Sequence, residues 1–67
     1  MMPTPKQQEE MAQLKRWMPY RIIYGALHPD TKEWRVDAVT TMRRPKKLAR
    51  EGWQVWIYGS GLDAAAS

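Results

Sequence analysis

Two properties of the sequence limit its possible folds most: the chain is short, and it has no cysteine. With 67 residues and no Cys, it has room for one domain and cannot use disulfides or thiolate metal sites for stability. A domain this small needs a dense core or oligomerisation. Four Trp and three Tyr, with no Phe, indicate an aromatic core that reaches the domain boundary. We therefore expect one domain over residues 4–58, with flexible tails at 1–3 and 59–67.

Residues 5–17 have the pattern of an α-helix. Thr4 can cap its start, Pro5 occupies the favoured first helical position, and Gln7 stands where a capping box requires it. Met11, Leu14 and Met18 recur at helical spacing, with Trp17 beside them, and Pro19 ends the pattern. The sequence therefore predicts an amphipathic first helix.

Residues 44–51 form the second predicted helix. Pro45 marks its start, and Gly52 provides a C-terminal stop. Lys47 and Glu51 can pair across one turn. Its few apolar residues, Leu48 and Ala49 among them, are expected to face the rest of the domain, which leaves its charged residues outside.

Three segments rich in β-branched and aromatic residues predict strands over 20–27, 34–40 and 53–58. The first is apolar on both faces, as a central strand is, whereas the second is polar on most of one face, as an edge strand is. We therefore predict a small α+β domain of order αββαβ, whose three-stranded, mainly antiparallel sheet has the order 2-1-3. One helix would cover each face of this sheet.

The charge of the chain is concentrated in the second predicted helix. The formal net charge is +4, and five of the eleven basic residues lie within eight positions: Arg43, Arg44, Lys46, Lys47 and Arg50. Such local density attracts phosphate or an acidic protein surface. The first hypothesis is therefore a non-enzymatic module that binds nucleic acid through this helix, with help from Arg35 and from stacking on Trp56 or Tyr58. The alternative is that these charges only keep a small protein in solution.

The second hypothesis is a protein-interaction module, such as a small adaptor or inhibitor. Trp and Tyr are enriched in the cores of interfaces, and Trp56, Tyr58 and Trp17 are the candidates for such a surface. A homodimer is a special case. Trp53, which follows a helix stop, is expected to belong to the core instead.

Catalysis has little support in the sequence. The chain has one histidine, His28, and its serines, Ser60 and Ser67, both lie in the predicted tail. A nucleophile, a base and an orienting group cannot be assembled from these residues, and His28 has no partners for a metal site. We therefore expect no enzyme activity, no cofactor, no metal and no small-molecule substrate.

Two further expectations concern location and origin. The N-terminal residues have no apolar run typical of a signal peptide, and no segment reaches the length that spans a bilayer. We expect a cytoplasmic protein that does not contact membranes. A small reading frame with a basic helix also suits a phage or mobile-element accessory protein.

Overall fold

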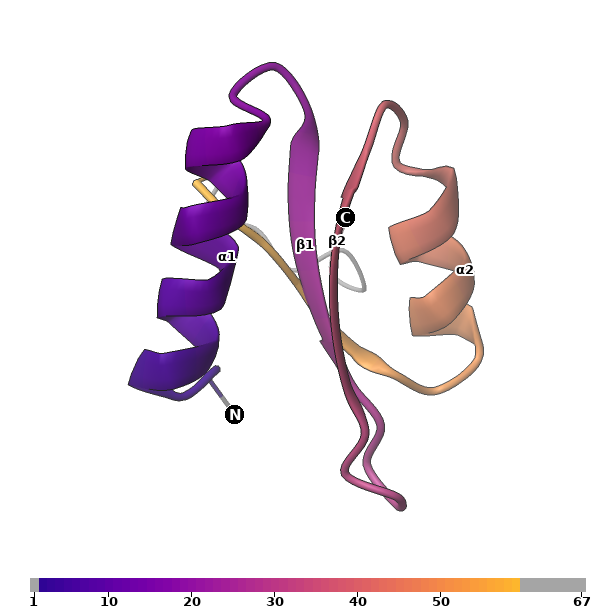
Figure 1. The fold of residues 1–67 in the computed structure, drawn as a ribbon. Coiled ribbons are helices and arrows are strands. Elements are labelled where there is room, and N and C mark those ends of the chain that lie inside the picture. The colour runs from indigo at the N-terminus through magenta and orange to yellow at the C-terminus, as the bar shows by residue number, and fades with distance from the viewer. Residues whose placement is uncertain (1, 60–67) are drawn as a thin grey trace.

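The computed structural model describes residues 2–59, which form two helices and three strands (Figure 1). The elements are α1 (Pro5–Trp17), β1 (Ile22–Leu27), β2 (Trp34–Val39), α2 (Arg43–Arg50) and β3 (Gln54–Ile57). The sheet has the order β2-β1-β3, and both neighbours run antiparallel to β1. The predicted αββαβ domain with strand order 2-1-3 is confirmed.

The sheet lies between the two helices, with α1 on one face and α2 on the other (Figure 1). The arrangement follows from β1, because this strand carries apolar side chains on both faces and both must be covered from water. Tyr24 and Ala26 point to the α2 side, and Ile23 points to the α1 side; all three are buried. One helix on each face is the smallest cover that such a strand allows.

Helix α1 begins as its sequence predicts. The Thr4 hydroxyl accepts a hydrogen bond from the Gln7 backbone N–H, and the Gln7 side chain accepts one from the Thr4 N–H. Just before the cap, Pro3 is buried and its carbonyl accepts a bond from Gln8 Nε2. Pro3 is therefore packed against the domain. Neither described helix is long and apolar enough to cross a membrane.

On the α1 side, a tryptophan lies across a glycine. Trp34 of β2 covers Gly25 of β1, so closely that a Cβ atom on Gly25 would overlap the ring carbon Cη2 and come within 2.9 Å of the Met11 sulfur. The Trp34 indole N–H donates to the Glu10 carboxylate at 2.6 Å, and its ring lies 6.4 Å from that of Trp56. The ring is thus held between β1, Trp56 of β3 and α1.

On the α2 side, the core is a cluster of five buried residues: Tyr24, Ala26, Leu48, Trp53 and Val55. Helix α2 contributes Leu48 to it, and Pro45 of the same helix is also buried. Trp53 is 9% exposed, which confirms its predicted place in the core. Its ring lies nearly perpendicular to that of His28, with 5.0 Å between ring centroids.

The strands are shorter than predicted, and α2 starts and ends one residue earlier. The main difference is at β1, which was predicted to start at Tyr20 but starts at Ile22. Met18 to Arg21 form a turn instead, in which the Arg21 N–H donates to the Met18 carbonyl at 3.1 Å. Pro19 fixes the second position of this turn. Met18 is therefore 44% exposed rather than part of the buried stripe of α1.

Candidate functional site

The basic residues of α2 share one side of the helix. Successive residues turn by about 100° around a helix axis. Pro45 and Leu48 are buried against the sheet and Ala49 is half-buried, as expected for residues on one side. The five basic residues fall on the remaining arc and are exposed: Arg43, Arg44, Lys46, Lys47 and Arg50. The whole outer surface of α2, called the basic face below, is therefore positive.

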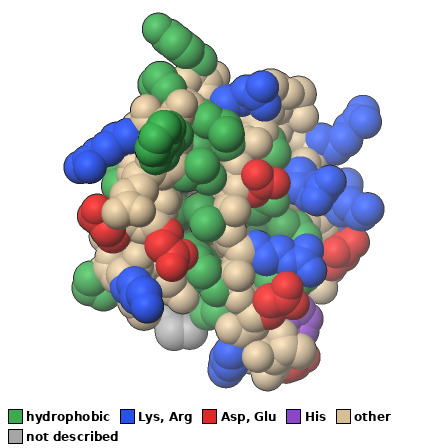
Figure 2. All heavy atoms as spheres, viewed as in Figure 1, with side chains coloured by type: hydrophobic (Ala, Val, Ile, Leu, Met, Phe, Trp, Pro, Cys, Tyr) green, Lys and Arg blue, Asp and Glu red, His purple; other side chains and the backbone are tan. Residues whose placement is uncertain are grey.

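The protein's own carboxylates do not neutralise the basic face. Within residues 2–59, the only ion pair joins Arg35 to Glu33, and neither residue belongs to α2. The Lys47–Glu51 pair that the spacing predicted is not formed. Figure 2 shows several Lys and Arg side chains gathered on the α2 side, with Asp and Glu side chains near some of them. The basic face thus carries uncompensated positive charge.

A hollow borders the basic face where the end of β2 leads into α2. It has a volume of about 470 Å³ and is open to solvent. Its lining includes Val39, Thr40 and Thr41, together with four basic residues and one carboxylate: Arg21, Arg43, Arg44, Lys47 and Asp37. Three of these cations belong to the basic face. The hollow, called the basic hollow below, has the charge and the shape to accept an anionic group.

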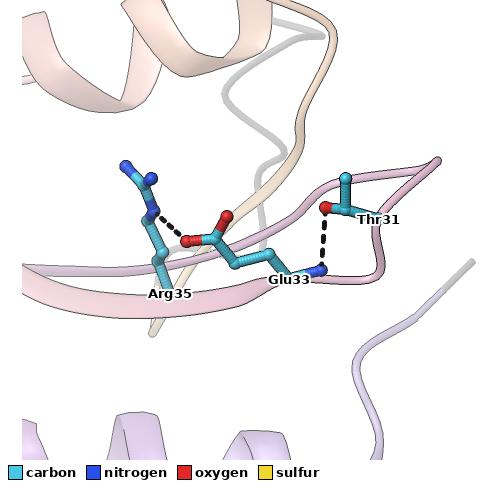
Figure 3. A network of polar contacts seen from close by, with 3 residues as sticks. All are labelled: Thr31, Glu33 and Arg35. Carbon is cyan, nitrogen blue, oxygen red and sulfur yellow. Dashed lines mark hydrogen bonds and ion pairs between the residues drawn. The ribbon is translucent and has the colours of Figure 1, made fainter.

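Arg35, the sixth residue predicted to bind nucleic acid, has other partners. Its Nε donates to the Glu33 carboxylate at 2.9 Å, and the Glu33 backbone N–H donates to the Thr31 hydroxyl at 3.3 Å (Figure 3). The guanidinium carbon also lies 4.7 Å from the centre of the Trp53 ring. Much of the charge of Arg35 is therefore compensated locally, unlike that of the α2 residues.

The side chain of Tyr24 is buried in the α2-side core, and charged residues of the basic hollow act on its hydroxyl. Burial raises the pKa of Tyr24 above its usual value, and the Asp37 carboxylate raises it further, while Arg44 and Arg35 lower it. Asp37 and Arg44 line the hollow, so the hollow lies near the polar end of the α2-side core. Any anion there would add to the effect of Asp37 on this pKa.

We expect Tyr24 to make stability depend on alkaline pH. A raised pKa in the folded state favours the protonated phenol, so this contribution is complete below pH of about 10 and is lost as pH rises through the folded-state pKa. The free energy of unfolding should therefore fall above about pH 10, by at most roughly 1.4 kcal/mol per pH unit from this group. Urea titrations from pH 8 to 11 should show a shallower fall for Tyr24→Phe. The same change at the exposed Tyr20 is the matched control for the loss of a hydroxyl.

The three predicted interface aromatics are scattered. Trp17, at the end of α1, is 82% exposed, and Tyr58, just after β3, is 38% exposed. Trp56 is half-buried and packs beside Trp34 on the α1 side. Neither Trp56 nor Tyr58 is among the residues that line the basic hollow.

Two residues near the basic hollow were missed by the sequence analysis. Arg21 lines the hollow, and Tyr20, its neighbour in the turn, is 99% exposed. Both were assigned to the first strand, where they would have been paired. Pro19 was the available signal, because a proline after a helix favours a turn as well as a helix end.

Elsewhere in residues 2–59, no three His, Asp or Glu residues gather in a way that could hold a metal ion. Compared with known proteins, the chain matches no family model, no curated protein and no solved structure.

Proposed function

We propose that the protein is a non-enzymatic module that binds nucleic acid through the basic face of α2. The observation that carries this proposal is the uninterrupted positive outer surface of α2, whose five cations have no ion-pair partner among residues 2–59. A row of phosphates is the most common ligand for such a surface, because each contact releases bound counterions.

The placement of these charges also opposes the stability of the helix. Arg43 and Arg44 stand in the first turn, where the helix dipole is positive and acidic residues are favoured. Arg43 and Lys47 repel each other across one turn, as do Lys46 and Arg50. By contrast, α1 mixes Glu9 and Glu10 with its basic residues. Solubility alone does not require like charges to stand so close together that they weaken the helix. Binding to a row of phosphates does require several cations on one side of the helix.

A salt titration tests the proposal. Binding of a labelled oligonucleotide, followed by fluorescence anisotropy, should weaken linearly on a logarithmic plot as salt rises. Five phosphate contacts predict a slope of about −4.5 for duplex DNA and about −3.5 for a single strand. Absence of binding to any nucleic acid at low salt would refute the function proposed for α2.

A matched pair of double variants separates the basic face from net charge. Lys46→Gln with Arg50→Gln removes two charges from α2, and Lys6→Gln with Arg16→Gln removes two exposed charges from α1. The α2 variant should flatten the salt slope by about 1.8 on duplex DNA, because two phosphate contacts are lost. The α1 variant should change the slope little. Equal effects would mean that the protein attracts nucleic acid only through its overall charge.

A protein partner is the second candidate, supported by the exposure of Trp17. A tryptophan 82% exposed contributes little to the core, and such residues often anchor interfaces. A second copy of the chain would be the simplest such partner. Sedimentation velocity tests this case, since substitution of Trp17 by alanine should then convert a dimer to a monomer.

A further inference from the structure

We infer that the ligand is single-stranded nucleic acid, whose phosphates enter the basic hollow and whose bases stack on Tyr20 and Trp17. The inference rests on the proposed function and names the kind of nucleic acid. It depends on the two exposed rings standing at the same end of the sheet as the hollow.

The strand register brings these parts together. Ile22 at the start of β1 pairs with Val39 at the end of β2. The chain that precedes Ile22 and the chain that follows Val39 therefore emerge at the same end of the sheet. Arg21 and Thr41 come from these two segments, and both line the basic hollow. The turn that carries Tyr20 is thus anchored at the rim of the hollow.

The turn holds Tyr20 outward on a fixed backbone. It is closed by the hydrogen bond from the Arg21 N–H to the Met18 carbonyl and is fixed at its second position by Pro19. Lys15 Nζ of α1 donates to the Arg21 carbonyl at 3.1 Å, which ties the turn to the helix. Tyr20 is 99% exposed, so its ring contributes nothing to the core. Because the backbone of the turn is already fixed, a ligand that stacks on this ring does not have to order the backbone when it binds.

Trp17 extends the surface to the other side of the edge strand β2. With Leu14 of α1 and Val36 of β2, it lines a shallow groove on the α1 side. The basic hollow lies against the last residues of the same strand, from Asp37 to Val39. In Figure 2, hydrophobic side chains lie near the middle of the view, beside the α1 side, and basic ones lie on the α2 side. An extended strand crossing the end of β2 would meet cations on one side and an aromatic ring on the other.

This combination selects against duplexes. Paired bases are stacked within the helix and present only their edges, so a duplex can use the cations but not the rings. Single strands offer free base faces, and proteins that bind them combine a positive groove with exposed aromatic residues.

The test compares ligands of equal length on the full chain at low salt. Labelled oligothymidine and oligouridine provide the single strands, and a mixed-sequence duplex provides the comparison. We expect either single strand to bind about tenfold more tightly than the duplex. Tyr20→Ala and Trp17→Ala should each weaken single-strand binding about fivefold or more, with little effect on the duplex. Tyr20→Phe, which keeps the ring, should bind as the wild type does. The exposure of both rings means that these variants should unfold at the same denaturant concentration as the wild type.

The outcomes separate this inference from the proposed function. If the duplex binds as tightly as the single strands, the inference is wrong while nucleic-acid binding by α2 stands. If the alanine variants bind single strands like the wild type, the rings serve another partner, such as a protein, and the inference is again wrong. If no polymer binds, both fail. Tighter binding of either single strand with loss in both alanine variants supports the inference, and the difference between the two strands shows whether DNA or RNA is preferred.

Discussion

Replacing Gly25 with alanine is expected to remove a large part of the protein's stability. The new methyl group would overlap the Trp34 ring and come within 2.9 Å of the Met11 sulfur. The ring cannot move aside easily, because its N–H is bonded to Glu10 and its other side is beside Trp56. Overpacking of a filled core costs about 1–3 kcal/mol or more, and a domain of this size has only about 3–5 kcal/mol to lose.

A second substitution distinguishes this clash from a general loss of stability. Trp34→Val alone should destabilise the domain, because it removes a large packed ring. In the Gly25→Ala background, the same change should cost much less, since it makes room for the methyl group. The coupling between the two sites, measured by urea unfolding of the four proteins, should be about 1–3 kcal/mol. Additive effects would show that the two residues do not compete for the same space.

The fold was predictable because each level of the sequence pointed to the same arrangement. The capping residues before α1 and the apolar faces of β1 define the elements, and the strand that needs cover on both sides must be central. The contact between Trp34 and Gly25 was not predictable, because it joins two strands whose register a single sequence does not reveal. For the same reason, the sequence did not indicate that an aromatic ring covers Gly25.

The candidate site was predictable only where it lies on one element. The basic residues of α2 are neighbours in the sequence, and helical geometry places them outside once Leu48 is buried. The basic hollow depends on Arg21, which is far from α2 in the sequence and reaches it through the pairing of β1 with β2. Arg35 shows the opposite case. It was grouped with the basic residues of α2 because of its charge, but its guanidinium pairs with the Glu33 carboxylate and lies over the Trp53 ring.

Function and stability should therefore respond in opposite directions when the basic face is neutralised. The test variant carries glutamine at all five positions: Arg43, Arg44, Lys46, Lys47 and Arg50. Because Gln has a helix propensity close to those of Arg and Lys, the variant changes charge with little change in helix formation. Nucleic-acid binding should fall below detection at physiological salt, since every phosphate contact of α2 is lost.

The same variant should be more stable than the wild type at low salt. Like charges stand three or four residues apart along α2 in five pairs, namely 43–46, 43–47, 44–47, 46–50 and 47–50. Each such pair costs about 0.2–0.5 kcal/mol, so removal of all five should raise the free energy of unfolding by about 1–2.5 kcal/mol. Added salt should reduce this difference, because it screens the repulsion in the wild type. Urea unfolding at low and high salt measures both effects. A variant that lost binding and stability together would show that the basic face contributes to the fold, and the argument that its charges are there for a ligand would fail.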